Sequence, residues 1–194
     1  LEILETDSSL ITELSSYIIG AGGKRIRPLL TLASARLCQY SGNRHLNLAS
    51  AIEFIHTATL LHDDVVDGSK KRRGKKTANF IWGNKPSILV GDFLLSKAFK
   101  ILINDGSLKC IDIVSNVSEK ISFGEVKQLM SVGNLNMSET DYLEIIGYKT
   151  AELFSAACQL SAEISEIEET KKKSLKDFGY FLGISYQIID DTLD

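Results

Sequence analysis

Residues 46–67, LNLASAIEFIHTATLLHDDVVD, decide the fold class of this chain. Apolar residues recur in this stretch at intervals of three and four positions, which is the spacing of one helix face. The same spacing recurs along most of the 194 residues, and strand-like alternation is absent. The sequence therefore predicts an all-α protein in which long helices with short connections pack as a bundle.

The same pattern places the other helices. A first helix is expected to end at GAGG, residues 20–23, and Pro28 is well placed near the start of a second. Ser138 with Asp141 resembles a capping box, which predicts a helix that starts there. Residues 68–76 are expected to form a solvated loop. The first helix carries Leu4, Leu10, Ile11, Leu14 and Ile18, and the later helices are predicted at about 28–40, 46–67, 84–103, 108–132, 138–164 and 168–194.

The bulk composition is that of a globular protein. Hydrophobic residues make up 44% and charged residues 24%, and the net charge of −3 gives no overall basic field for nucleic acid. No apolar run is long enough for a membrane span, the start is not a signal peptide, and the chain lacks an initiator Met. We expect residues to be missing at one or both ends.

The cysteines argue against a disulfide framework or a zinc site. The three of them, Cys38, Cys110 and Cys158, form no C-x-x-C pair, and their number is odd. This favours small core residues in a reducing compartment, the cytoplasm.

An acidic motif ends the helix at 46–67. Asp63 and Asp67 are four residues apart, so both carboxylates point to one side of the helix, and Asp64 flanks them. His56 lies two turns earlier on nearly the same face. Carboxylates this close repel unless a divalent cation bridges them, and hard oxygen ligands suit Mg²⁺. A solvent-facing acidic turn would also explain one such motif.

The acidic motif returns at residues 186–194, YQIIDDTLD. Asp190, Asp191 and Asp194 have the same spacing as the first motif and again follow an apolar helical stretch. Gln187 lies on that same side, three residues before Asp190. Two facing helices could hold a metal cluster between them, which predicts an Mg²⁺ site.

Basic residues form two clusters, one within GGKRIRP and one just after the first acidic motif. Arginine binds phosphate oxygens in a bidentate manner, and lysine acts as a point charge. Beside a metal site and an apolar helix, such residues indicate a diphosphate ester with a greasy tail. Lys24, Arg25 and Arg27 come from GGKRIRP, Arg72 and Arg73 follow the first acidic motif, and Lys75 and Lys76 are interpreted as surface charge.

Together these residues resemble the trans-prenyl diphosphate synthases, the head-to-tail polyprenyl synthetase family, in its long-chain form. The resemblance implies an isoprenoid-synthase-like all-α bundle around a deep central cavity, usually a homodimer. Residues 1–194 would form a single synthase domain whose C-terminal part is missing. The matching segments are GGKRIRP, HTATLLHDDVVD, RRGKKTAN, VGDFLLSKAF, GEVKQL, YKTAELFSAAC and GISYQIIDDTLD.

The resemblance also implies an activity. The enzyme would condense isopentenyl diphosphate with an allylic diphosphate such as farnesyl diphosphate, by ionisation assisted by about three Mg²⁺ ions and attack on the carbocation. Implied metal ligands are Asp63, Asp64, Asp67, Asp190, Asp191 and Asp194. Arg72, Lys149 and Gln187 would contact the allylic diphosphate with Thr150 near the developing cation, and Lys24, Arg27, His56 and Arg73 would bind isopentenyl diphosphate. Asp63, Asp64, Asp67, Lys149, Thr150 and Gln187 form the implied catalytic set.

Product length has its own position in the family pattern. Bulky residues four and five positions before the first acidic motif block the growing chain, and here Thr59 and Ala58 stand there. Neither is aromatic, so the expected product is long, octaprenyl or a neighbouring length for quinone side chains. Such a product seeks membranes, although the enzyme is expected to lack a transmembrane segment.

Two departures from the family pattern leave alternatives open. Gly68 stands where the family often has an acidic residue, and the chain stops at Asp194, whereas related enzymes continue. A non-catalytic truncated paralogue or regulatory subunit of a heteromeric synthase is the first alternative, which loss of motif residues would favour. A class I terpene cyclase would not require the second acidic motif, and a diphosphate hydrolase would not require a second anion pocket.

Overall fold

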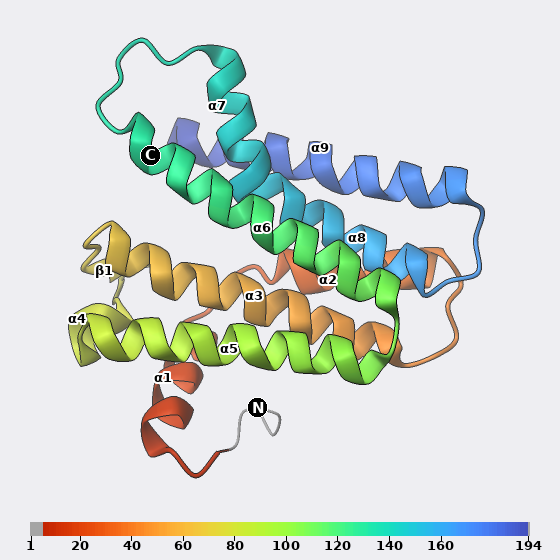
Figure 1. Cartoon of the computed structure of the whole chain (residues 1–194), viewed down its shortest axis with the longest axis horizontal. Helices are drawn as coiled ribbons and strands as arrows, with labels where there is room; N and C mark the ends of the chain where they lie inside the picture. Colours follow the sequence, from red (N-terminus) through yellow and green to blue (C-terminus); the bar gives the residue numbers. More distant parts are fainter. Residues whose placement is uncertain (1–5, 194) are drawn as a thin grey trace. The chain divides into compact units, whose positions relative to one another are not determined.

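The computed structural model describes residues 6–193, and this part of the chain confirms the all-α prediction (Figure 1). Gly68 follows the end of a helix with φ of +61°, and the Ser138 hydroxyl caps the helix that follows it, as its sequence signal predicts. Leu4 lies outside the described residues. The α-helices are α1 (Ser9–Gly20), α2 (Ile26–Leu37), α3 (Arg44–Val66), α4 (Ala78–Trp82), α5 (Asn84–Asp105), α6 (Leu108–Ser131), α7 (Glu139–Ile146), α8 (Glu152–Glu163) and α9 (Glu169–Leu193).

The described residues separate into two compact units. Unit 1 comprises residues 6–25 and 53–100, and unit 2 comprises residues 26–52 and 101–193. Helices α3 and α5 contribute residues to both units. Each unit has packing of its own, and the prediction that residues 1–194 form one domain stays a prediction.

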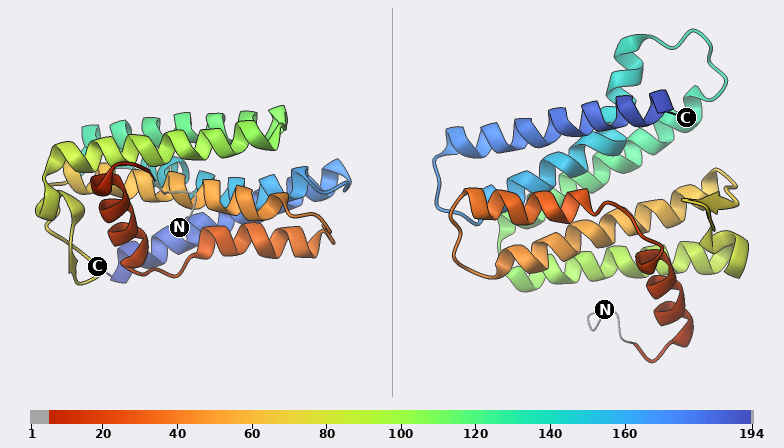
Figure 2. Two further views of the ribbon diagram at one scale, coloured as in Figure 1. Left: turned by 90° about the horizontal axis from the view of Figure 1, so that it is seen from below. Right: turned by 180° about the vertical axis from the view of Figure 1, so that it is seen from behind.

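Helix α8 is the buried centre of unit 2. It contacts α9, α2 and α6, and Figure 2 shows these helices running along it. Every residue from Glu152 to Cys158 is buried, as expected for a helix covered on several sides. Its serines are satisfied inside this core, since Ser161 donates to the carbonyl of Thr31 at 2.5 Å and Ser155 donates to that of Lys176 at 2.9 Å.

Two glycines let α9 closely approach α8 and the residue just before it. A Cβ on Gly179 would lie 2.6 Å from the carbonyl oxygen of Phe154, and one on Gly183 would lie 2.5 Å from Cα of Ala151. Only glycine therefore fits at these positions without a shift of the backbone. This contact brings the second acidic motif, at the C-terminal end of α9, beside the segment that contains Thr150.

In unit 1, α3 packs against α5 around His62. Its Nε2 atom lies 3.2 Å from the carbonyl oxygen of Ile88 and 3.4 Å from a carboxylate oxygen of Asp92. Gly91 leaves room for the imidazole, because a Cβ there would overlap the ring. Helix α1 packs on α4 through an edge-to-face contact of Tyr17 with Trp82, with ring centroids 5.2 Å apart.

The solvated-loop prediction for residues 68–76 is wrong in one respect. Strands β1 (Lys71–Arg72) and β2 (Lys75–Lys76) form a short antiparallel hairpin, and helix α4 follows it. Arg73 and Gly74 have φ of +51° and +76°, which is the backbone of a tight two-residue hairpin turn. The two strands are too short to show alternation, so the sequence pattern carries no sign of them.

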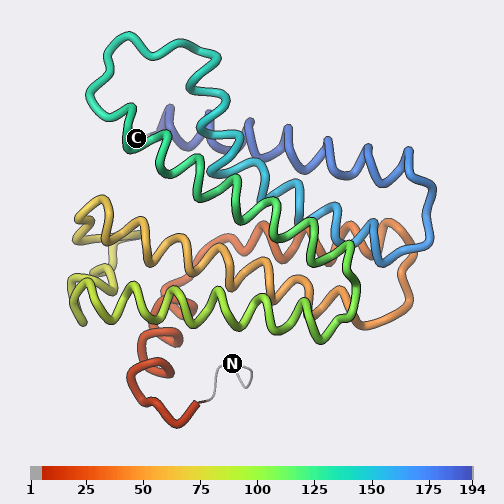
Figure 3. The backbone as a smooth tube through the Cα atoms, viewed as in Figure 1, coloured from red at the N-terminus to blue at the C-terminus, as the bar shows by residue number. Residues whose placement is uncertain are grey.

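The prediction of one continuous α-helix over 138–164 is also wrong in its middle. A π-helical turn, η2 (Gly147–Ala151), joins α7 to α8. Gly147 sits under the Tyr180 hydroxyl, where a Cβ would lie 2.6 Å from the oxygen. Figure 3 traces the preceding connection, residues 132–138, from α6 to α7. In the portion of the chain described, no helix has the length and apolar character needed to cross a membrane.

Candidate active site

The first acidic motif stands at the C-terminal end of α3, and its central carboxylate is buried. Asp64 is 1% exposed, and its Oδ1 accepts a hydrogen bond from Nε of Arg72 at 2.9 Å. Asp63 is half-buried and Asp67 is exposed. The acidic and basic segments therefore meet in one ion pair whose aspartate is buried and whose arginine is half-buried.

Burial raises the pKa of the Asp64 carboxyl above its ordinary value, while the charge and hydrogen bond of Arg72 lower it and the charge of Asp67 raises it. The other carboxylate oxygen, Oδ2, is buried and has no hydrogen-bond partner among the described residues. A buried acceptor of this kind carries free capacity for a cation or a donor.

Side chains after the hairpin fix the end of α3. Asn79 donates from Nδ2 to the main-chain carbonyl of Asp64 at 2.9 Å, and the Thr77 hydroxyl donates to the carbonyl of Ser69 at 2.6 Å. Both belong to the segment RRGKKTAN. They donate to carbonyl groups at and just after the end of the helix, where the Asp64 carbonyl also accepts from the main-chain nitrogen of Ser69 at 3.0 Å.

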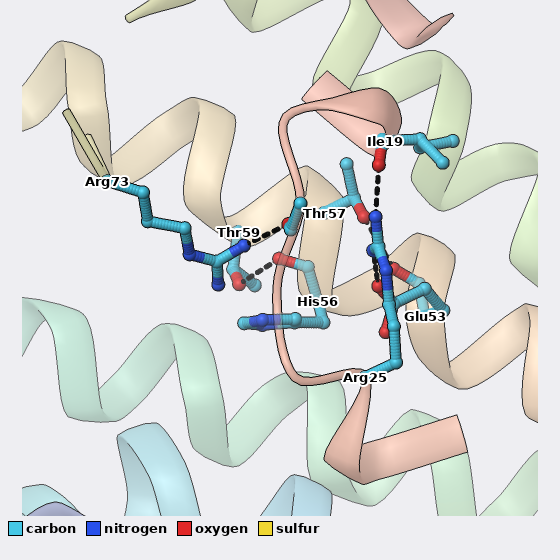
Figure 4. A network of polar contacts seen from close by, with 8 residues as sticks. Ile19, Arg25, Glu53, His56, Thr57, Thr59 and Arg73 are labelled. Carbon is cyan, nitrogen blue, oxygen red and sulfur yellow. Dashed lines mark hydrogen bonds and ion pairs between the residues drawn. The ribbon is translucent and has the colours of Figure 1, made fainter. Parts of the chain in front are cut away.

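The basic loop at 22–25 and the hairpin turn meet in unit 1. Arg73 donates to the carbonyl of Gly22, and Arg25 pairs with Glu53 and donates to the carbonyl of Ile19 (Figure 4). Burial, and next the charge of Arg73, lowers the pKa of Arg25. Arg25 and Arg73 both have left-handed backbones, with φ of +49° and +51°, a strained conformation that is typical of functional sites.

The residues predicted to bind isopentenyl diphosphate divide between the units. Lys24, His56 and Arg73 belong to unit 1, with His56 on α3 beside this loop (Figure 4). Arg27 belongs to unit 2, where its guanidinium carbon lies 4.6 Å above the ring of Phe154. Their joint action on one substrate stays a prediction.

The two predicted chain-length residues lie one turn before the acidic motif. Ala58 is 2% exposed, and Thr59 is half-buried. The Thr59 hydroxyl donates to the carbonyl of His56 at 2.9 Å, so it is satisfied by its own helix. Their role in product length stays a prediction.

In unit 2, three predicted site residues form a hydrogen-bonded chain. The Thr150 hydroxyl donates to Oε1 of Gln187 at 2.8 Å, and Nε2 of Gln187 donates to Oδ1 of Asp191 at 2.7 Å. Tyr142 completes the chain, because its hydroxyl donates to Oδ2 of Asp191 at 2.6 Å. Burial, and next the hydrogen bond and charge of Asp191, raises the pKa of Tyr142 to about 12, so the hydroxyl remains a donor at neutral pH.

Lys149 and Thr150 both stand on the π-helical turn η2. Nζ of Lys149 lies 2.9 Å from a carboxylate oxygen of Glu125 on α6, whose other oxygen is buried without a partner among the described residues. Single π-turns within α-helices occur frequently at functional sites. This turn therefore presents the lysine and the threonine of YKTAELF in a setting that regular helix periodicity does not predict.

The second acidic motif is exposed at the end of α9. Asp190 and Asp191 are exposed, and Asp194 lies outside the described residues. Across residues 6–193, no group of three or more His, Cys, Asp or Glu side chains could by itself hold a metal ion. The donors still fit Mg²⁺, since they are carboxylates, Asp64 offers a buried unpaired oxygen, and Mg²⁺ usually binds through one or two carboxylates with waters and phosphates.

Sequence reasoning missed three residues that the structure adds to this region. Tyr142 carried no sequence signal, because its partner Asp191 is far away along the chain. Glu125 stood within the quoted segment GEVKQL, although its contact with Lys149 was not foreseen. Asn79 stood within a quoted family segment, although its contact with the Asp64 carbonyl was not foreseen. The cysteine prediction is confirmed for Cys110 and Cys158, which are free and buried, whereas Cys38 is free and half-buried.

The chain is similar to known prenyl synthases along its whole length. It is 48% identical to the octaprenyl diphosphate synthase of Escherichia coli (strain K12) over 194 residues, 100% of this chain and 60% of that protein. A decaprenyl diphosphate synthase structure from Rhodobacter capsulatus superimposes with a TM-score of 0.97 at 48% identity, covering 100% of this chain and 60% of that one.

A polyprenyl synthase from Caulobacter crescentus, solved with calcium and isoprenyl diphosphate, gives a TM-score of 0.97 at 48% identity, with 99% of this chain and 58% of that one covered. The chain thus spans about 60% of the length of the relatives it matches. These structures confirm the predicted isoprenoid-synthase fold. Because the family model described as polyprenyl synthetase also matches residues 8–194, the chain belongs to the polyprenyl synthetase family.

Proposed function

We propose that this chain belongs to a trans-prenyltransferase that condenses isopentenyl diphosphate with an allylic diphosphate to make a long-chain polyprenyl diphosphate. The observation that carries the proposal is the hydrogen-bonded chain of Thr150, Gln187 and Asp191. These residues come from two separate motifs, 37 positions apart at the Thr150–Gln187 contact, and their side chains meet. Membership of the polyprenyl synthetase family supports the same activity.

The reaction needs no protein nucleophile. The C–O bond of the allylic diphosphate breaks and its electron pair leaves with the diphosphate. The isopentenyl double bond then attacks the allylic cation, a C–C bond forms, and one proton is lost to the released diphosphate. Arg72, Lys149 and Gln187 would contact the leaving diphosphate, and Thr150 would stand near the developing cation.

Six aspartates, Asp63, Asp64, Asp67, Asp190, Asp191 and Asp194, would hold Mg²⁺, about three ions in all. When bound, the metal stabilises negative charge on the leaving diphosphate. Lys24, Arg27, His56 and Arg73 would bind the second substrate, isopentenyl diphosphate. His56 would act there as a phosphate ligand rather than as an acid or base.

Product length and assembly complete the proposal. Small residues at Ala58 and Thr59 support a long product, octaprenyl or a neighbouring length, for quinone side chains. A homodimer is proposed from the family resemblance. A reducing compartment, the cytoplasm, is supported by three free cysteines among the described residues.

One assay tests the activity. The full-length protein is incubated with Mg²⁺, farnesyl diphosphate and labelled isopentenyl diphosphate, and the extracted products are sized. We expect long-chain products whose formation stops in Asp63→Ala, with the helical circular dichroism unchanged. Absence of any elongation by the wild-type protein would reject the proposal and favour the non-catalytic subunit.

A further inference from the structure

Asp191 is held from two sides in unit 2. The Tyr142 hydroxyl donates to Oδ2 at 2.6 Å, and Nε2 of Gln187 donates to Oδ1 at 2.7 Å. Gln187 is one turn earlier on the same helix, whereas Tyr142 belongs to α7. The exposed end of α9 therefore has a fixed carboxylate where a surface aspartate would ordinarily rotate freely.

Helix α7 is itself anchored on both sides of Tyr142. Ser138 accepts a hydrogen bond from the main-chain nitrogen of Asp141 at 3.1 Å, which fixes the first turn. Nζ of Lys127 on α6 lies 2.5 Å from Oε2 of Glu144 and 3.7 Å from Oδ1 of Asp141. The tyrosine thus reaches Asp191 from a helix tied to a third element of the same unit.

We propose that Tyr142 is a positioning residue of the second acidic motif, which holds the Asp191 carboxylate in the orientation that diphosphate-bound Mg²⁺ requires. A carboxylate offers about four acceptor positions, so the two donors leave capacity for further interactions. Partners that orient metal-site carboxylates typically change metal affinity or activity by roughly 10–100-fold when removed. The inference rests on the proposed function, which makes the second motif a metal site.

The test separates positioning from a structural role. Binding of Mg²⁺ with inorganic diphosphate is measured by titration calorimetry on the full-length protein, without turnover. Tyr142→Phe keeps the ring and removes the donor, so the apparent Mg²⁺ affinity should fall by roughly 10–100-fold. In the elongation assay the Mg²⁺ concentration for half-maximal rate should rise by a similar factor, and kcat should recover at saturating Mg²⁺.

Tyr17→Phe is a matched control. It removes a tyrosine hydroxyl that donates to the carbonyl of Lys76 at 2.7 Å within unit 1, whereas the second acidic motif belongs to unit 2. Its Mg²⁺ affinity should remain within about twofold of the wild type. In an Asp191→Asn background, Tyr142→Phe should add almost no further loss, because its effect passes through the Asp191 carboxylate.

The outcomes are distinct. Unchanged Mg²⁺ affinity in Tyr142→Phe, or a rate loss that saturating Mg²⁺ does not restore, overturns the positioning role. Full additivity of the two changes overturns it as well. Wild-type protein that binds Mg²⁺ and diphosphate but elongates nothing rejects the proposed activity alone, and wild-type protein that binds neither rejects both.

Discussion

Arg72 and Asp64 form an ion pair in which Nε of the arginine lies 2.9 Å from Oδ1 of the aspartate. The aspartate is 1% exposed and the arginine side chain 31% exposed, so the pair reaches from the hairpin into the protein. Burial raises the pKa of Asp64, and Arg72 is the main group that opposes this rise. The acid and the base of one short segment are therefore energetically linked.

Arg72→Leu should leave the Asp64 carboxylate buried without its partner. We expect the free energy of unfolding at pH 7 to fall by about 1–3 kcal/mol, measured by urea unfolding with circular dichroism. Since the folded pKa of Asp64 is already raised, its contribution to stability is full at low pH and is lost as pH rises through that pKa. Without Arg72, the folded pKa of Asp64 should rise further, so its loss of stability extends to higher pH. The stability deficit of the variant relative to the wild type should therefore be smaller at pH 4 than at pH 7.

Lys75→Leu, in the facing strand and exposed, is the control and should change stability by less than about 0.5 kcal/mol. Equal deficits of Arg72→Leu at pH 4 and pH 7 would contradict the electrostatic explanation.

Gly183→Ala should destabilise unit 2, although alanine favours helices over glycine by about 1 kcal/mol. The new Cβ would lie 2.5 Å from Cα of Ala151 on η2, so α9 must move away from η2 and α8. Overpacking of this kind costs about 1–3 kcal/mol, and the thermal midpoint should fall. Gly20→Ala in α1 is matched, since no heavy atom lies within 4 Å of its Cβ, and it should be neutral or slightly stabilising. A Gly183→Ala protein as stable as the wild type would refute the close approach.

The cysteines should differ in reactivity. Cys110 and Cys158 are 0% exposed and burial raises the pKa of both thiols, so they hold little thiolate at pH 8. Burial also raises the pKa of the half-buried Cys38, to which solvent has partial access. Titration with a thiol reagent should modify at most Cys38 in the native protein within minutes and all three in denaturant. Rapid modification of the two remaining thiols in native Cys38→Ser would contradict the burial of Cys110 and Cys158.

Chain length should respond at the turn before the first acidic motif. If the proposed activity holds, Ala58→Phe should shorten the product, which chromatography of the extracted prenols measures. Because Ala58 is 2% exposed, a phenylalanine there also risks overpacking, so the thermal midpoint is measured alongside. Thr59→Phe at the half-buried neighbour is the second variant, and an unchanged product length in both folded variants would refute the proposal that small residues at these positions permit a long product.

The helices were predictable because their signals are local. Apolar spacing, Pro28, the GAGG stretch and the Ser138 cap are each read within a few residues, and each predicted helix has its counterpart in the described chain. The hairpin and α4 were not foreseen, since four strand residues and a five-residue helix are too short for periodicity to show.

By itself, the sequence determined the all-α class, the two acidic motifs and the family, because each depends on residue type and spacing along the chain. Only the tertiary structure decided that Arg72 pairs with Asp64 and that Tyr142 reaches Asp191. It also decided that Lys149 stands on a π-turn. The Arg72–Asp64 and Tyr142–Asp191 contacts join residues 8 and 49 positions apart, and they form only when folding brings separate elements together.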